Sequence, residues 1–191
     1  GIRGVAACQK AKGYGREGPH NCYHGGTIYQ AAASRLVKVH NQVSLGASET
    51  VIGKAAFEDW IWNLAGGLAK HYHSDNGIFQ ADLFKADCKE KKQTQSYSGV
   101  GAKHQNAHAE RTIQTISYWA RTLMVHAALH WPSDGADSVR LWAFAVQHAA
   151  WLYNRLPNKH LNWKSPLEMF TKTKSDHRDL LRSHVWGCPA F

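Results

Sequence analysis

Acidic residues are scarce in this sequence, and their scarcity narrows the class of partner. The 191 residues include 14 Asp and Glu against 23 Lys and Arg, so the formal net charge at pH 7 is +9. A basic surface concentrates nucleic acid because it neutralises phosphates and releases their counterions. The charge favours a polyanionic partner, although many basic domains bind no nucleic acid.

Cysteines are few, and long apolar runs are lacking. The four cysteines, Cys8, Cys22, Cys88 and Cys188, form no C-x-x-C pair, which argues against a zinc ribbon and a disulfide framework and favours a reduced, intracellular setting. No run of about 18 apolar residues could span a membrane, and the first residues lack the apolar stretch of a signal peptide. Because the chain does not begin with Met, we expect a fragment or a processed piece.

Motifs of several enzyme classes are also missing. The sequence has no Gly-rich nucleotide-binding loop, no Ser-His-Asp order and no H-E-x-x-H zinc motif. It has no internal repeat and no low-complexity tract. With 43% hydrophobic residues the chain can bury one good core, so we expect one domain with a helical extension.

One acidic residue follows a short predicted strand. Residues 68–73 predict a strand that leads into Ser74-Asp75-Asn76-Gly77. A carboxylate at the carboxyl end of a central strand is accessible to a ligand, and Asn-Gly allows a sharp turn. An ordinary Asx turn explains the same residues. His71 and His73 share one strand face and could ligate zinc, but the chain has 13 histidines and a chance pair is common.

A second acid, Glu110, lies at the start of a long predicted helix, residues 107–129. Its expected buried stripe is Ile113, Ile116, Ala120, Leu123, Met124 and Ala127. Gln114, Ser117 and Arg121 share another face with Glu110, and Arg111 lies beside it. A Glu in the first turn of a helix also interacts favourably with the helix dipole, which explains Glu110 without a catalytic role.

The loop before this helix, residues 99–106, is rich in Gly and basic side chains. Loops of this kind often carry function, and Lys103, His104 and Gln105 could insert toward DNA. A solvated connector is the alternative. Tryptophans 119, 142 and 151 are more often core residues than platforms for base stacking.

The remaining pattern predicts alternating strands and helices. A helix at 50–64 is capped by Ser48, and its expected apolar stripe is Val51, Ile52, Ala55, Ala56, Trp60 and Leu64. Glu58 and Asp59 are expected on its solvated face. The other expected elements are strands at 27–31, 36–40 and 94–97 and helices at 81–92, 139–156 and 166–171.

Four blocks resemble the catalytic core of copia-type retrotransposon integrases and the segment that follows it. They are Ser74-Asp75-Asn76-Gly77, Gln105-Asn106-x-x-Ala109-Glu110-Arg111, Ser165-Pro166-Leu167-Glu168-Met169-Phe170 and Gly187-Cys188-Pro189-Ala190-Phe191. The resemblance covers roughly residues 26–191. The sequence departs from the family pattern at Ala31-Ala32-Ala33, where an Asp is usual, and at Ala107, which replaces a Gly.

The resemblance implies a ribonuclease H-like α/β fold, a mixed sheet flanked by helices, with a C-terminal helical and irregular extension. In that family two aspartates and a glutamate bind Mg²⁺ or Mn²⁺ for 3′-end processing and strand transfer. Asp75 and Glu110 carry over as catalytic and metal-binding residues. The first aspartate does not, because no acid precedes Glu17, and we expect this chain alone to be inactive.

The same resemblance implies a DNA-binding surface and a division of the chain. The expected DNA contacts are Lys103, His104, Gln105, Asn106, Arg111, Gln114 and Arg121. Residues 1–25 form a Gly-rich irregular lead-in, 26–157 the integrase core without its first strand, and 158–191 a basic post-core segment. The partners are the element's DNA ends, target DNA and further copies of the chain, and no membrane. The expected location is nuclear after cytoplasmic translation.

Three functions remain open from the sequence. The first is an integrase core whose first strand and aspartate lie upstream of Gly1. The second is a DNA-binding remnant of such an element without catalysis. The third is an assembly module whose Trp-rich helices pair with another subunit, which would be a dimer indifferent to DNA.

Overall fold

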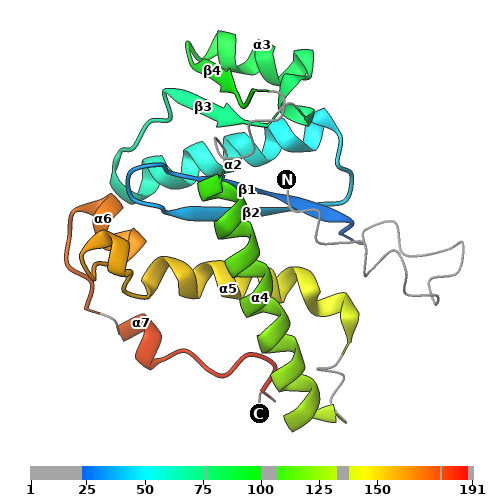
Figure 1. Cartoon of the computed structure of the whole chain (residues 1–191), viewed down its shortest axis with the longest axis vertical. Helices are drawn as coiled ribbons and strands as arrows, with labels where there is room; N and C mark the ends of the chain where they lie inside the picture. Colours follow the sequence, from blue (N-terminus) through cyan, green and yellow to red (C-terminus); the bar gives the residue numbers. More distant parts are fainter. Residues whose placement is uncertain (1–22, 76, 100–106, 133–137, 177, 189–191) are drawn as a thin grey trace, which may run out of the picture. The chain divides into compact units, whose positions relative to one another are not determined.

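The computed structural model describes residues 23–75, 77–99, 107–132, 138–176 and 178–188 (Figure 1). The described chain forms two compact units. Unit 1 contains the first strand up to Tyr29 and residues His40–Thr112, and unit 2 contains Gln30–Val39 and the residues from Ile113 onward. Each unit is described separately below.

The first two strands form a hairpin. Strand β1 (Gly25–Gln30) pairs with β2 (Val37–Gln42), and the backbone N–H of Ala31 donates to Leu36 O at 2.8 Å across the turn. Arg35 takes the left-handed conformation in this turn, with φ 60°. The two predicted strands are confirmed, each shifted by one or two residues.

Helix α2 (Ala47–Ala65) follows the hairpin, and Gly66 ends it in the left-handed conformation at φ 61°. Its N-cap is Gly46 rather than Ser48. The Glu49 carboxylate accepts hydrogen bonds from the backbone N–H groups of Val43 at 2.8 Å and Ser44 at 3.0 Å, so the side chain that ties down the helix start is the acid rather than the serine.

The buried face of α2 differs from the predicted stripe. Its buried residues are Thr50, Gly53, Lys54, Phe57 and Ile61, whereas the predicted Ile52 is 58% exposed. Apolar residues surround most of this helix, so spacing alone did not define one face. The buried face is set by partners in unit 1, since the Tyr29 hydroxyl donates to Thr50 O at 2.6 Å and its ring stacks on Phe57.

Lys54 forms the centre of an ion-pair cluster in unit 1. Its side chain is 0% exposed, and Nζ donates to Glu58 Oε1 at 2.9 Å and to the Asp87 carboxylate. Lys91 bridges the same two acids at 2.9 and 3.2 Å, and Tyr72 donates to Glu58 at 2.7 Å. The prediction that Glu58 lies on a solvated face is therefore wrong, while Asp59 is exposed as predicted.

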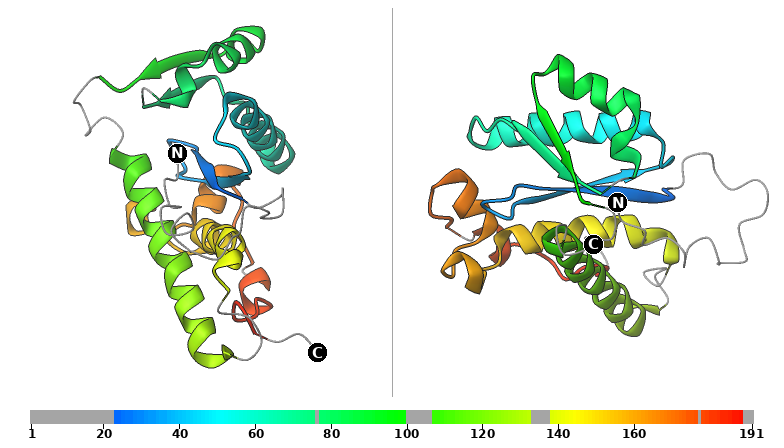
Figure 2. Two further views of the ribbon diagram at one scale, coloured as in Figure 1. Left: turned by 90° about the vertical axis from the view of Figure 1, so that its right-hand side faces the viewer. Right: turned by 45° about the horizontal axis from the view of Figure 1, so that its top comes forward.

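The second sheet of unit 1 is parallel. Strand β3 (His71–Ser74) pairs with β4 (Thr94–Tyr97), with His71 opposite Thr94 and Ser74 opposite Tyr97. The short helix η1 (Ile78–Gln80) and helix α3 (Asp82–Glu90) lie between them in sequence. Both views of Figure 2 show this pair of strands next to α3.

Unit 2 is helical, and most of helix α4 (Ala107–His130) belongs to it. Of the stripe predicted to be buried in α4, Ile116, Ala120 and Ala127 are buried and the rest are half-buried. The predicted helix at 139–156 is a turn of 3₁₀ helix, η4 (Val139–Leu141), followed by α5 (Trp142–Arg155). Tryptophans 119, 142 and 151 are half-buried.

The post-core segment is more ordered than predicted. It contains η5 (Lys159–Leu161), α6 (Pro166–Thr171) and α7 (Arg178–Leu181), of which only α6 was expected. Ser165 and Glu168 form a capping box at the start of α6, which explains why local sequence alone defined this helix. No helix among the described residues is long and apolar enough to cross a membrane.

The described strands form two separate two-stranded sheets, β1–β2 and β3–β4. The sequence predicted one mixed sheet. Within the described residues β3 pairs only with β4, so its predicted place at the centre of a sheet is not seen. The coarser prediction, a mixed α/β chain with helices and small sheets, is confirmed.

Candidate active site

Asp75 lies directly after β3, at the carboxyl end of the parallel β3–β4 pair. The last paired position joins Ser74 to Tyr97, and the next backbone N–H, that of Ser98, donates to Ser74 O at 2.9 Å. The Asp75 side chain is exposed. Its Oδ1 lies 3.5 Å from the position that a Cβ on Gly77 would occupy. The carboxylate therefore lies beside the Gly77 backbone, where solvent and a ligand reach it.

The two histidines before Asp75 are held by hydroxyl groups of β4 and the residue after it. The ring nitrogens of His71 lie 2.7 Å from Thr94 Oγ1 and 2.8 Å from Ser96 Oγ, and His73 Nδ1 also lies 2.8 Å from Ser96 Oγ. His73 Nε2 lies 3.3 Å from Ser98 Oγ. All four ring nitrogens have hydroxyl partners, so these side chains order the exposed face of the strand pair and need no zinc ion to hold them.

Glu110 is exposed in the first turn of α4 and belongs to the same unit as Asp75. Arg111, also exposed, follows it. Further along the helix Gln114 and Arg121 are exposed at the spacing that keeps them on the Glu110 face. The Gln114 side chain donates to the Tyr118 hydroxyl at 3.1 Å. The helix therefore presents one polar, solvent-accessible face.

Part of the predicted site lies outside the described residues. Asn76 and the loop residues Lys103, His104, Gln105 and Asn106 fall there. Their predicted contacts with DNA stay predictions.

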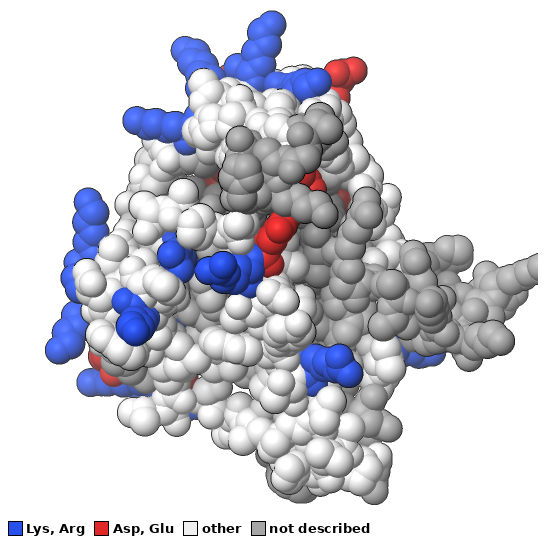
Figure 3. Space-filling view, in the orientation of Figure 1, with Lys and Arg blue, Asp and Glu red and all other residues white. Residues whose placement is uncertain are grey.

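Three exposed lysines on α3 and in the turn after it were not singled out from the sequence, and they are called the lysine row below. Lys85 and Lys89 lie four residues apart on one side of α3, and Lys92 lies in the turn that follows the helix, with φ 54°. Among the described residues no hydrogen bond or ion pair of their ammonium groups is seen. Figure 3 shows Lys or Arg side chains projecting into solvent over α3, which stands uppermost in Figure 1. The four-residue spacing of Lys85 and Lys89 in a predicted helix could have revealed the part of this row that lies on α3.

The ion-pair cluster around Lys54 is structural in character. Burial alone would raise the pKa of Glu58, but hydrogen bonds from Lys54, Gln93, Lys91 and Tyr72 lower it to about 2. Glu58 therefore stays ionised at neutral pH, with its oxygens occupied by these donors. It is poorly suited to bind a metal ion or to accept a proton in a reaction.

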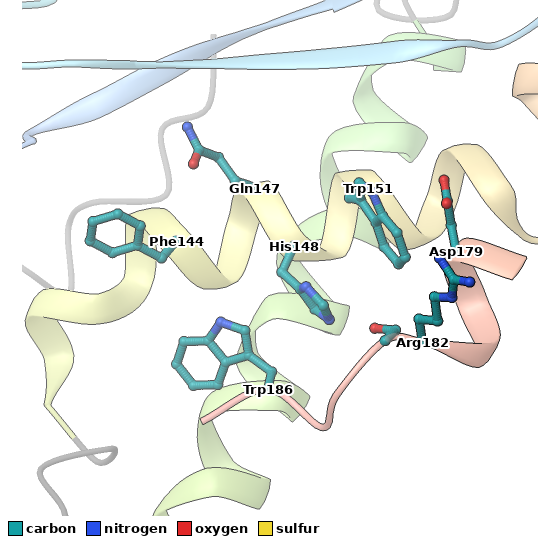
Figure 4. A pocket seen from close by; sticks show the side chains of 8 residues that line it. Phe144, Gln147, His148, Trp151, Asp179, Arg182 and Trp186 are labelled. Carbon is teal, nitrogen blue, oxygen red and sulfur yellow. The ribbon is translucent and has the colours of Figure 1, made fainter. Parts of the chain in front are cut away.

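A groove of about 700 Å³ lies in unit 2 between α5 and the segment that follows α7 (Figure 4). The Arg155 guanidinium lies 4.2 Å from the centre of the Trp151 ring and pairs with Asp179 at 3.2 Å. His148 stacks against Trp151 at 5.7 Å, and burial lowers the pKa of this histidine. The groove is lined by Phe144, Gln147, His148, Trp151, Asp179, Arg182, Ser183 and Trp186. It contains neither Asp75 nor Glu110.

The chemistry of Asp75 and Glu110 suits a hard divalent cation. Mg²⁺ and Mn²⁺ prefer carboxylate and water oxygens, and both side chains are exposed carboxylates in unit 1. Within the described ranges no group of three or more His, Cys, Asp or Glu side chains is placed to hold a metal ion. Asp75 and Glu110 each offer carboxylate oxygens to such a cation, and their role as metal ligands stays a prediction.

Comparison with solved structures defines the class of this fold as that of integrase catalytic cores. The catalytic core of HTLV-2 integrase in complex with magnesium matches in its trimeric form with a TM-score of 0.52 and 20% identity over 76% of this chain and 91% of that one. Its dimeric form matches with a TM-score of 0.53 and 20% identity, over 76% and 83%.

A third match is the simian T-cell lymphotropic virus intasome in complex with the PP2A regulatory subunit B56 gamma. Its TM-score is 0.57 and its identity 16%, over 77% of this chain and 48% of that one. No protein-family model and no curated protein matches the sequence. The integrase core fold predicted from the sequence is confirmed at this level.

Proposed function

We propose that this chain is the core of a copia-type retrotransposon integrase, with a ribonuclease H-like sheet as its scaffold. The observation that carries the proposal is the position of Asp75 at the carboxyl end of β3, with Glu110 opening α4 in the same unit. The integrase-like fold, the sequence blocks and the net charge of +9 support it. DNA is the substrate, and the active form is a homo-oligomer that acts in the nucleus.

In this proposal Asp75 and Glu110 hold Mg²⁺ or Mn²⁺ through carboxylate oxygens. The cation, when bound, supplies a Lewis acid that lowers the pKa of a water or DNA hydroxyl and stabilises the leaving oxygen. A divalent cation is held by the summed negative charge of its carboxylate ligands, so each carboxylate binds it more weakly when another is missing. The family trio requires a third carboxylate, which in this family is an aspartate on the first strand of the core.

Arg111, Gln114 and Arg121 contact the DNA backbone from the exposed face of α4, together with Lys103, His104, Gln105 and Asn106. Phosphate contacts of this kind fix register and orientation without reading sequence. Lys85 and Lys89 on α3 and Lys92 in the turn after it extend the basic surface. Binding through all of these groups should be strongly salt-dependent.

The test measures Mn²⁺ binding by electron paramagnetic resonance and, in parallel, strand transfer with labelled oligonucleotides. Asp75→Asn and Glu110→Gln should each weaken Mn²⁺ binding roughly tenfold or more, while the exposed control Asp59→Asn should leave it unchanged. A version extended upstream by a strand that bears an Asp should join DNA strands, and Asp75→Asn in that version should abolish the joining. Wild-type affinity for Mn²⁺ in both Asp75→Asn and Glu110→Gln would refute the site.

The second candidate is a DNA-binding remnant without catalysis. It is favoured by the finding that, among the described residues, no group of three or more His, Cys, Asp or Glu side chains is placed to hold a metal ion. Salt-sensitive DNA binding without strand joining at any Mg²⁺ or Mn²⁺ concentration, also in the extended version, would support it. Strand joining by the extended version would exclude it.

A further inference from the structure

Trp163, in the loop between η5 and α6, is an exposed tryptophan in an unfavourable backbone conformation. It is 70% exposed. It follows Asn162, and the two residues take the left-handed conformation with φ 62° and 54°. Residues with a Cβ rarely adopt this conformation, and strain of this kind is typical of functional sites. Burial of the indole does not offset the strain, so we looked for a function that requires an indole in solvent.

The loop that carries Trp163 is closed by its own backbone hydrogen bonds. The N–H of Trp163 donates to Asn158 O at 3.0 Å, and the N–H of Asn158 donates to Lys164 O at 3.1 Å. The N–H of Lys164 donates to Leu161 O at 3.1 Å. Leu161 is buried, and so is Ser165, which caps α6 directly after the loop. The backbone that carries the indole is therefore firmly held.

Two lysines accompany the indole. Lys159 follows Asn158, which is hydrogen bonded to Lys164, so the two lysines leave the loop from neighbouring stretches of backbone. Both are exposed, and among the described residues no hydrogen bond or ion pair of their ammonium groups is seen. Residues 138–167 include no Asp or Glu, and the next acid, Glu168, is engaged in the capping box of α6. The loop therefore carries uncompensated positive charge.

An exposed indole between cations matches an unpaired nucleic acid strand. An unpaired base stacks on an aromatic ring, and its phosphates pair with nearby ammonium groups. In a duplex the neighbouring bases already cover both faces of each base. Within the described part of the chain the Trp163 ring stacks on no other ring, unlike Trp151, which stacks on His148. An apolar protein partner fits less well, because His160 and Asn162, the exposed neighbours of the indole, are polar.

We propose that Trp163, Lys159 and Lys164 form a binding site for single-stranded nucleic acid. One unpaired base stacks on the indole, and the phosphates on either side of it meet the two ammonium groups. Every base has a π-face, so the site accepts strands of any sequence, of DNA or of RNA. It needs no metal ion and does not depend on Asp75 or Glu110, which belong to the other unit.

The experiment measures fluorescence anisotropy of labelled strands on the full chain in the presence of EDTA. The probes are thymidine and uridine oligonucleotides of about ten nucleotides and a blunt DNA duplex. Trp163→Ala should weaken binding of both single strands roughly tenfold, and Trp163→Phe, which keeps a ring, should recover most of the affinity. Trp163→Gly removes the strain as well as the ring, so it should bind as weakly as Trp163→Ala although it is the more stable variant.

The lysines are tested by salt dependence. The double variant Lys159→Gln and Lys164→Gln should reduce the slope of log K against log salt for single strands by up to about 1.4, since each phosphate contributes about 0.7. A blunt duplex offers no unpaired base, so its binding should change neither in this variant nor in Trp163→Ala. Photocrosslinking of a strand that contains 5-iodouracil should label the peptide with Trp163.

The matched control is Trp62→Ala, which removes an indole that is 56% exposed in unit 1. It should bind single strands as wild type does. Wild-type affinity for single strands in Trp163→Ala, or an equal loss in Trp62→Ala or on the duplex, would overturn the proposal. Binding to phosphatidylserine vesicles that is lost in Trp163→Ala, with single-strand binding kept, would overturn it in favour of a membrane surface.

Two further comparisons complete the test. Equal affinity for the thymidine and uridine strands supports a site that reads only base faces and phosphates, and tighter binding of the uridine strand identifies RNA as the ligand. Asp75→Asn should leave single-strand binding unchanged. Failure of the Trp163 site and failure of the carboxylate site therefore give different results, the first in strand affinity and the second in Mn²⁺ binding.

Discussion

Asn154 on α5 holds both backbone groups of Val37 at the start of β2. The backbone N–H of Val37 donates to Asn154 Oδ1 at 2.9 Å, and Asn154 Nδ2 donates to Val37 O at 2.6 Å. Asn154 is 4% exposed and Val37 is 1% exposed. A single side chain therefore makes the two backbone hydrogen bonds that a neighbouring strand would make at Val37. Water does not reach this buried residue to make them.

Replacing Asn154 should destabilise unit 2. Asn154→Leu keeps a similar volume but leaves a buried N–H and a buried C=O without partners, which should lower the free energy of unfolding by about 2–4 kcal/mol. Urea denaturation measures the change. Gln147→Leu, at an exposed position of the same helix, is the control and should change stability by less than about 0.5 kcal/mol. Equal losses in both variants would show that the two hydrogen bonds contribute nothing.

The ion-pair cluster should make stability depend on acid pH through Glu58. Its pKa is lowered from 4.5 to about 2 in the folded protein, so its contribution is complete above the unfolded pKa and is lost as pH falls toward the folded one. The loss should be on the order of 2 kcal/mol. Urea unfolding at a series of pH values from neutral to acid measures it.

Two variants isolate this effect. Glu58→Gln should be less stable at neutral pH and should lose less stability on acidification than wild type does. Asp59→Asn alters the exposed neighbour and should keep the wild-type pH dependence. If the stability of Glu58→Gln falls with pH as steeply as that of wild type, other carboxylates produce the pH dependence of stability.

The loop before α6 contains a bulky residue in a strained backbone conformation. Trp163 has φ 62°, follows Asn162 at φ 54°, and is 70% exposed. A left-handed conformation costs roughly 1–2 kcal/mol for a residue with a Cβ, and an exposed indole returns little through burial. Trp163→Gly should therefore stabilise the protein by about 1 kcal/mol, measured by thermal and urea unfolding. Trp163→Ala, which keeps a Cβ, should give no such gain, and an equal gain in both would point to the indole instead of the backbone.

The lysine row of α3 and the turn after it should strengthen DNA binding without sequence preference. Replacing Lys85, Lys89 and Lys92 by Gln should reduce the slope of log K against log salt by up to about 3 for duplex DNA, since each neutralised phosphate contributes about 0.9. Fluorescence anisotropy with labelled duplexes at several salt concentrations measures the slope. The same charge change at Lys159, Lys164 and Lys174 in unit 2 is the comparison. An unchanged slope in the α3 variant would remove this row from the DNA surface.

Several elements followed directly from local sequence. The range of β4 and that of α6 were predicted to the residue, α6 because Ser165, Pro166 and Glu168 act within one turn. The start of α4 at Ala107 was also predicted, whereas the strand before Asp75, predicted at 68–73, begins three residues later and ends one residue later. Asp75 and Glu110 were selected from the sequence, and their metal-binding role stays a prediction.

Other features depended on residues far apart in the chain. The face of α2 that is buried includes Lys54, a charged residue that no apolar pattern selects, because the carboxylates of Glu58 and Asp87 neutralise its charge. Nothing near Asn154 in the sequence indicates that its side chain forms hydrogen bonds with the backbone of Val37. The two-stranded sheets likewise depend on pairing between strands that local propensity cannot specify.

The sequence by itself determined the approximate positions of most helices and strands, the excess of basic charge, and the two acids at a strand end and a helix start. These depend on capping, turn chemistry and periodicity, which act over a few residues. Only the tertiary structure decided which helix faces are buried, which charges are paired, and that the rings of His126 and His130 stack at 4.0 Å. Burial, ion pairing and ring stacking depend on distances in space between side chains, and those are fixed only when the chain has folded.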